Sequence, residues 1–117
     1  MALSLGSIVI AEVVDPQGNN AKERPVIILD DATGETIAVM GITSTLPDPL
    51  PEGYIELPWY HDRHSVTGLT RRSAAVIKWA TVIDKDSVIR SPGYRCPAAQ
   101  LREIIRLLER LDSDETS

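Results

Sequence analysis

Two apolar runs decide the fold of this chain: RPVIIL at Arg24–Leu29 and TIAVMGITS at Thr36–Ser44. Each is short, rich in valine and isoleucine, and bounded by turn-forming residues, which is typical of a buried β-strand. The turn-forming stretch Asp30–Glu35 between them predicts an antiparallel hairpin. At its open end Arg24 begins one strand and Thr43–Ser44 end the other, so we expect a guanidinium and two hydroxyls to lie close together. Such a group of donors suits a phosphate.

Further strands are predicted on either side of this hairpin. Short apolar runs indicate strands at Ser7–Val14, Tyr54–Leu57 and Ser73–Ile83, with a short strand or turn at Lys85–Arg90. The stretch Thr45–Gly53 contains three prolines, which cannot donate hydrogen bonds to a sheet, and it is expected to form a loop.

The C-terminal segment predicts a helix over about residues 97–111. Pro97 suits the first helical position. Apolar residues then recur every three or four positions, at Leu101, Ile104, Ile105, Leu108 and Leu111. This stripe is expected to cover the sheet, although it also fits a partner helix. We therefore predict one mainly β domain with a C-terminal helix over residues 1–111, followed by a frayed acidic tail at 112–117.

Composition limits the core and the compartment. Of the 117 residues, 43% are hydrophobic but only 4% are aromatic and none is phenylalanine, so the core must be built from aliphatic side chains. The single cysteine, Cys96, excludes an intrachain disulfide and fits a reducing compartment. Because neither a signal peptide nor a transmembrane span is recognisable, we expect a cytoplasmic protein without membrane association.

Charge is distributed unevenly along the chain, whose net charge is -5. Residues 1–58 carry nine acidic and two basic side chains, whereas residues 61–111 carry five acidic and ten basic ones. This asymmetry permits a basic face on an acidic protein, and phosphate binding depends on that local face. The alternative is that the basic side chains are spread over solvated surfaces.

Five short segments resemble, in order and spacing, the MazF/PemK family of toxin endoribonucleases. They are GSIV at 6–9, KERPVIIL at 22–29, GITS at 41–44, GL at 68–69 and SAAVIK at 73–78. The resemblance covers most of the chain. It implies an SH3-like β-barrel with a C-terminal helix, a homodimer, a cognate acidic antitoxin, and cleavage of single-stranded RNA without metal or cofactor.

The same resemblance implies that Arg24 and Thr43 are catalytic. Arg24 would hold the scissile phosphate and stabilise its developing charge, because a guanidinium holds its proton too tightly to act as a base. Thr43 and the neighbouring Ser44 would donate hydroxyl hydrogen bonds to the phosphate. Attack by the ribose 2′-oxygen would then need no protein nucleophile.

One departure from the family leaves the general acid and base unassigned. The PemK branch places an arginine and an aspartate on the strand that matches Ala74–Trp79, and a histidine in the first loop; here the corresponding residues include Lys78 and Asn19. His61 and His64 have the unperturbed pKa that suits proton transfer at neutral pH, and they flank Arg63 in one loop. The predicted substrate-binding residues are Ser44, Asn19, Lys22, His61, Arg63, His64 and Lys78.

Alternatives to this interpretation concern both the residues and the function. Arg24 also fits a surface arginine that opens a strand, and Thr43 fits an ordinary strand residue. His61 and His64 also fit an uninvolved exposed loop, and a zinc site that used them with Cys96 would lack a fourth ligand. A binding module on the same barrel, with catalysis lost, is the first functional rival. A gyrase inhibitor of the CcdB type is the second, but CcdB engages its target through an apolar C-terminus, whereas this chain ends in DSDETS.

Overall fold

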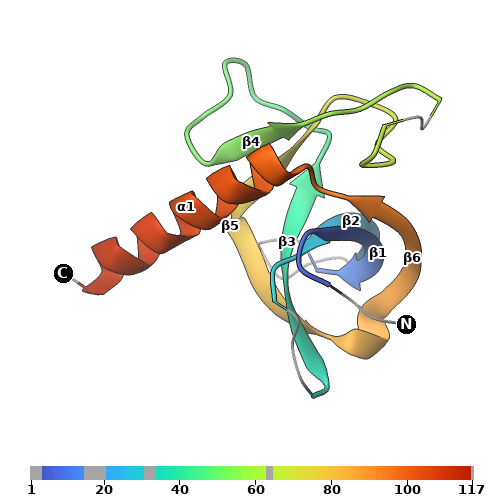
Figure 1. The fold of residues 1–117 in the computed structure, drawn as a ribbon, viewed down its shortest axis with the longest axis horizontal. Helices are drawn as coiled ribbons and strands as arrows, with labels where there is room; N and C mark the ends of the chain where they lie inside the picture. The colour runs from blue at the N-terminus through green and yellow to red at the C-terminus, as the bar shows by residue number, and fades with distance from the viewer. Residues whose placement is uncertain (1–3, 15–20, 31–33, 63–64, 117) are drawn as a thin grey trace.

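The computed structural model describes residues 4–14, 21–30, 34–62 and 65–116, the last five of them as helix backbone. These residues form a mainly β chain with a C-terminal helix, as predicted (Figure 1). The elements are β1 (Ser7–Val13), β2 (Lys22–Ile28), β3 (Thr36–Thr43), β4 (Tyr54–Leu57), β5 (Ser73–Asp84), the 3₁₀ turn η1 (Lys85–Ser87), β6 (Val88–Arg95) and α1 (Ala98–Thr116).

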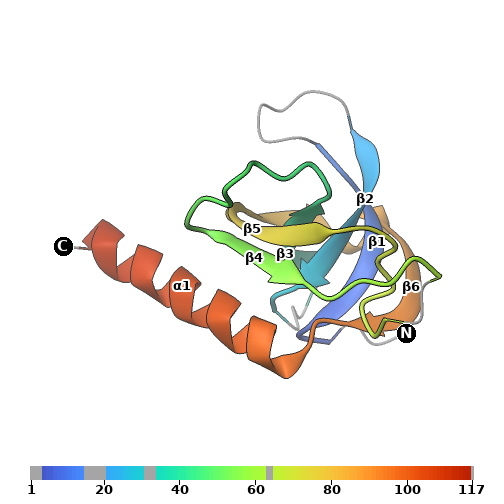
Figure 2. The ribbon, with the colours of Figure 1, turned by 90° about the horizontal axis from the view of Figure 1, so that it is seen from above.

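All six described strands belong to one curved sheet in the order β4-β5-β3-β2-β1-β6 (Figures 1 and 2). Neighbouring strands are antiparallel throughout. Within the described residues the two end strands do not pair with each other, so the expected barrel is open. β4 has only four residues, and the loop after it reaches β6 instead, through a 2.9 Å hydrogen bond from the Arg95 N–H to the Val66 carbonyl.

The predicted hairpin is formed by β2 and β3. Val26 lies opposite Gly41 and Ile28 lies opposite Val39. Opposed residues of an antiparallel pair point to the same face of the sheet. Continuing this register toward the open end of the hairpin brings Arg24 beside Thr43, as the sequence predicts.

β5 pairs with β3 in two stretches whose registers differ. Between these stretches four residues of β5, Val76–Trp79, face the single residue Gly41 of β3, which makes a bulge. A Cβ atom built on Gly41 would lie 3.0 Å from Cε3 of Trp79. The absence of a side chain at Gly41 therefore lets the Trp79 ring lie against the β3 backbone. The pairs on either side of the bulge are Met40 with Ala80 and Ile42 with Ala75.

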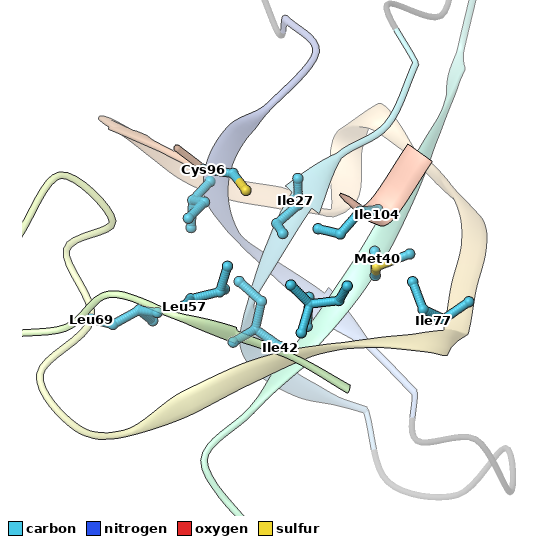
Figure 3. Packing of buried hydrophobic residues seen from close by; sticks show 11 residues of the cluster. Ile27, Met40, Ile42, Leu57, Leu69, Ile77, Cys96 and Ile104 are labelled. Carbon is cyan, nitrogen blue, oxygen red and sulfur yellow. The ribbon is translucent and has the colours of Figure 1, made fainter. Parts of the chain in front are cut away.

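Buried side chains form two aliphatic clusters, because neighbours along a strand point to opposite faces of the sheet. Ile27 belongs to the cluster that α1 covers, and Ile104 of α1 is fully buried within it (Figure 3). Val26 and Ile28, on either side of Ile27 in the chain, belong to the other cluster, against which Ile83 packs. Isoleucine, valine and leucine dominate both, as the composition predicts.

β6 is longer than the sequence predicts. Instead of a short strand or turn at Lys85–Arg90, η1 is followed by an eight-residue strand that ends at Arg95. The strand pairs with β1 through two register shifts, so its existence depends on a distant partner more than on its own apolar pattern.

α1 begins at Ala98, one residue after the expected start at Pro97. It continues to Thr116, so the backbone of residues 112–116 is helical where the sequence predicts fraying. The apolar stripe covers the sheet only in part. Leu101 and Leu108 pack against the first cluster as predicted, and Leu107 joins them, whereas Leu111 is 43% exposed.

Candidate phosphate-binding site

A hollow of about 590 Å³ lies at the open end of the hairpin, and we call it the Arg24 hollow. Its walls come from β1, β2, β6, the end of β3 and the segment that precedes β5. Its lining includes one carboxylate, that of Glu23. The cationic side chains in the lining are Lys22, Arg24, Arg71 and Arg90, and the hydroxyl side chains are Thr43, Ser44, Thr45, Thr67, Thr70, Ser73 and Tyr94. This acidic protein therefore has a locally basic surface.

Arg24 is half-buried near the start of β2. Its Nε atom is buried and has no hydrogen-bond partner among the described residues. Its Cζ atom lies 5.9 Å from the ring centroid of Trp79, within the range of cation–π attraction. The guanidinium brings a positive charge and planar N–H donors to the hollow.

Thr43 is 8% exposed at the end of β3. Its Oγ1 atom accepts a hydrogen bond of 3.1 Å from the backbone N–H of Thr45. A hydroxyl can accept and donate at once, so the Thr43 O–H is still able to donate. The contact with Thr45 orients the hydroxyl, while the adjacent Ser44 is exposed.

The three other cations of the hollow, Lys22, Arg71 and Arg90, are exposed, and no acidic side chain in the described ranges forms an ion pair with them. Arg72 behaves differently, because its Nε and Nη2 donate hydrogen bonds of 3.0 and 3.1 Å to the two carboxylate oxygens of Glu56. These bonds lower the pKa of Glu56 and raise that of Arg72. The charges around the hollow therefore remain available to an anion.

One wall of the hollow is a compact loop between β4 and β5. Thr67, 1% exposed, donates a 2.6 Å hydrogen bond to the Pro58 carbonyl and accepts one of 3.2 Å from the Leu69 N–H. Gly68 has a φ of +71°, and a Cβ there would lie 2.2 Å from the Tyr94 ring. Only glycine combines this backbone conformation with so close an approach, and the loop is thereby held against β6.

Not all predicted site residues meet at this hollow. Arg24, Thr43, Ser44 and Lys22 do, but Lys78 lines a second hollow on the Trp79 side of Arg24. His61 is exposed, and its ring centroid lies 4.5 Å from that of Tyr60 with the two rings tilted by 32°. It does not line the Arg24 hollow. The predictions for Asn19, Arg63 and His64 concern positions outside the described residues.

Sequence reasoning missed Arg71, Arg90 and Thr67 as site residues. In the sequence, Arg71 and Arg90 were only two of the ten basic residues counted between 61 and 111. They line one hollow because β6 pairs with β1, a long-range contact that no local pattern specifies. Thr67 carried a weak signal, because a threonine before glycine in a polar loop is common in turns.

Cys96 is an inert part of the core rather than a member of any site. Burial raises the pKa of its thiol to about 11. Across the described ranges, no three histidine, cysteine, aspartate or glutamate side chains are grouped so that they could hold a metal ion. Nor does any helix in these ranges have the length and apolar character needed to span a membrane.

Comparison with known proteins identifies the fold. No family model matches the chain, and no curated protein sequence matches it. A chain from the form-III crystal structure of MazE-MazF from Deinococcus radiodurans superposes with a TM-score of 0.68 at 15% identity, covering 97% of this chain and 98% of that one. The form-II structure gives 0.69 at 16% identity, with 95% of both chains covered. The protein has a MazF-like fold.

Proposed function

We propose that this protein is a metal-independent endoribonuclease that cleaves single-stranded RNA, and that it is the toxin of a toxin–antitoxin pair. The observation that carries the proposal is the placement of Arg24 beside Thr43 in a hollow with three further cations that lack acidic partners among the described residues. Single-stranded RNA presents successive phosphates that such a surface can track. The MazF-like fold over nearly the whole chain supports the same conclusion.

In the proposed reaction, the ribose 2′-oxygen attacks the adjacent phosphorus. A P–O2′ bond forms and the P–O5′ bond breaks, leaving a 2′,3′-cyclic phosphate and a 5′-hydroxyl. The 2′-hydroxyl loses one proton and the departing O5′ gains one, so neither water nor metal is consumed. Arg24 stabilises the charge that grows on the phosphoryl oxygens, and the Thr43 hydroxyl donates to one of them.

The remaining candidates are assigned to substrate binding. Lys22, Arg71 and Arg90 would hold phosphates on either side of the scissile one, since they line the same hollow as Arg24. Ser44 would add a hydroxyl donor next to Thr43. More distant nucleotides would be held by the other residues that the sequence predicts, Asn19, His61, Arg63, His64 and Lys78.

Two protein partners belong to this proposal. An acidic antitoxin is expected because the exposed cations of the hollow attract an acidic chain as they attract RNA. The MazE-MazF crystal structures with the same fold support such a complex. A second copy of this chain would extend the short basic surface into a groove across a two-fold axis. Sedimentation at micromolar concentration should therefore show a dimer.

The decisive experiment is cleavage of a fluorescent single-stranded RNA by the purified protein in excess chelator. We expect products with 2′,3′-cyclic phosphate and 5′-hydroxyl ends. A matched oligonucleotide with a single 2′-deoxyribose at the cleavage position should resist cleavage there, because it lacks the attacking oxygen. RNA that is bound but left intact would contradict the enzyme and favour the binding module.

A further inference from the structure

Trp79 on β5 lies next to the Arg24 guanidinium. The two residues line a second hollow of about 390 Å³, whose lining includes Val26, Val39 and Gly41 but no acidic side chain. The Cζ atom of Arg24 lies 5.9 Å from the Trp79 ring centroid, and its Nε is buried without a hydrogen-bond partner. Among the described residues, the aromatic ring is therefore the electrostatic partner of this cation.

Three features of the chain produce this contact. The bulge at Val76–Trp79 changes the register of β5 against β3. Gly41 leaves room for the ring, because a Cβ there would lie 3.0 Å from Cε3 and 3.4 Å from Cβ of Trp79. Gly41 also pairs with Val26, two residues from Arg24 on the same face of β2. The ring that lies against Gly41 is thereby brought next to Arg24.

We infer that Trp79 is a positioning residue for Arg24 in RNA cleavage, an inference that rests on the proposed function. A carboxylate partner would occupy guanidinium N–H donors and offset the charge, as Glu56 does for Arg72 through two hydrogen bonds. An aromatic face attracts the cation but consumes no N–H donor. Trp79 thus fixes the direction of Arg24 while leaving its charge and its outer donors for the phosphate.

Steady-state cleavage by substituted proteins tests this role. Trp79→Leu keeps apolar volume but removes the aromatic face, and we expect kcat to fall by about tenfold, the size of one partly desolvated cation–π contact. KM should change by less than about twofold, because the loss acts mainly on transition-state charge. Trp79→Phe keeps an aromatic face and should retain most of kcat.

Gly41→Ala provides an independent variant in which the tryptophan itself is intact. The added methyl group should displace the ring from β3 and lower kcat in the manner of Trp79→Leu. The matched control is Ile89→Ala, which shortens an exposed apolar side chain on β6 outside both hollows and should leave kcat unchanged. Thermal unfolding verifies that each variant is folded before its rate is interpreted.

A spectroscopic measurement detects the contact without any RNA. The chain has two tryptophans, so in a Trp59→Phe background the emission comes from Trp79 alone. Arg24→Met should then change the intensity and wavelength of that emission, because the cation leaves the ring. Arg72→Met, which removes a cation bound to Glu56 instead, should leave the emission unchanged.

The outcomes separate this inference from the proposed function. A parent protein that does not cleave RNA overturns the proposed function. An active parent with a fully active Trp79→Leu variant overturns the positioning role alone, as does Trp79 emission that is insensitive to Arg24→Met. The positioning role is supported if three results are found together. Trp79→Leu loses about tenfold in kcat, Trp79→Phe retains most of kcat, and the Trp79 emission changes with Arg24→Met but not with Arg72→Met.

Discussion

The Arg24 hollow and the β4–β5 edge place arginines in opposite electrostatic settings. At the edge, Arg72 is held by both carboxylate oxygens of Glu56. In the hollow, Arg71, the neighbour of Arg72 in the chain, forms no ion pair with an acidic side chain among the described residues. Arg24 lies against the aromatic ring of Trp79. An exposed ion pair contributes little to stability and cancels charge locally, whereas unpaired cations gathered in one place attract an anion. The arginines without an acidic partner therefore indicate where an anion would bind.

Removing the central cation of the hollow should have the largest effect. Arg24→Ala is expected to lower kcat for RNA cleavage by about 10²–10³-fold, because in the proposed mechanism it deletes a donor aimed at transition-state charge. The thermal midpoint should change little, since the side chain is only half-buried at a strand start. Cleavage by this variant at the parental rate would remove Arg24 from the mechanism.

The wall of the hollow can be destabilised at Gly68 without changing any of its cationic side chains. Gly68→Ala combines an unfavourable φ of +71° with a Cβ 2.2 Å from the Tyr94 ring, and should lower the free energy of unfolding by about 3 kcal/mol. Gly34→Ala is the control, because its φ is +105° but no atom lies within 4 Å of the added Cβ, leaving roughly 1–2 kcal/mol of backbone strain. Chemical denaturation measures both, and equal losses would contradict the close packing of the loop on β6.

Removing the hydroxyl of Thr43 should have the next largest effect. Thr43→Val keeps the side-chain shape and removes the hydroxyl that the proposed mechanism assigns as a donor to the phosphate, which is expected to lower kcat by roughly tenfold or somewhat more. Thr43→Ser retains the donor and should remain close to the parent. If Val and Ser variants cleave equally fast, the Thr43 hydroxyl has no role in the reaction.

The neighbouring pair Arg71 and Arg72 gives the most direct test of the comparison. Arg71→Ala should reduce the slope of log Kd against log salt concentration for single-stranded RNA by about 0.7, the value for one phosphate contact. Arg72→Ala should leave that slope unchanged, because its charge is already paired with Glu56. Titrations at several salt concentrations measure both variants, and identical slopes would show that ion pairing does not decide which arginine binds.

The smallest expected effect is on the pH dependence of stability. The hydrogen bond from Arg72 lowers the pKa of Glu56 in the folded protein, so the pair stabilises the fold above the unfolded pKa near 4.5. That contribution is lost as the pH falls through the folded value. The difference in thermal midpoint between the parent and Arg72→Ala should therefore be present at pH 7 and shrink at pH 3, whereas a constant difference would point to packing alone.

Local patterns predicted most elements of this fold. The valine-rich runs of the hairpin and the three-to-four spacing in α1 are signals that a single segment carries by itself. The full length of β6 and the open sheet were not predictable in this way, since they depend on pairing between β1 and β6 across most of the chain. The bulge opposite Gly41 is similarly a property of two strands together.

The candidate site was predictable only in part, for the same reason. Arg24 and Thr43 are brought together by one hairpin, whose register follows from adjacent strands. Arg71 and Arg90 join them through the β4–β5 loop and β6, whose positions no local pattern specifies. Trp79 was visible in the sequence as an aromatic strand residue, but its contact with Arg24 follows from the bulge.

The burial of Cys96 makes its thiol a natural probe of local opening in the core. The thiol lies in the cluster beneath α1, and its backbone N–H donates a 2.7 Å hydrogen bond to the Gly6 carbonyl. With a pKa of about 11, on the order of one thiol in a thousand is ionised at pH 8, and burial shields even that fraction from reagents. We therefore expect alkylation of the native protein to require local opening of the cluster beneath α1. The rate at which the thiol is alkylated then measures how often the cluster opens, and the measurement needs no substitution or attached probe.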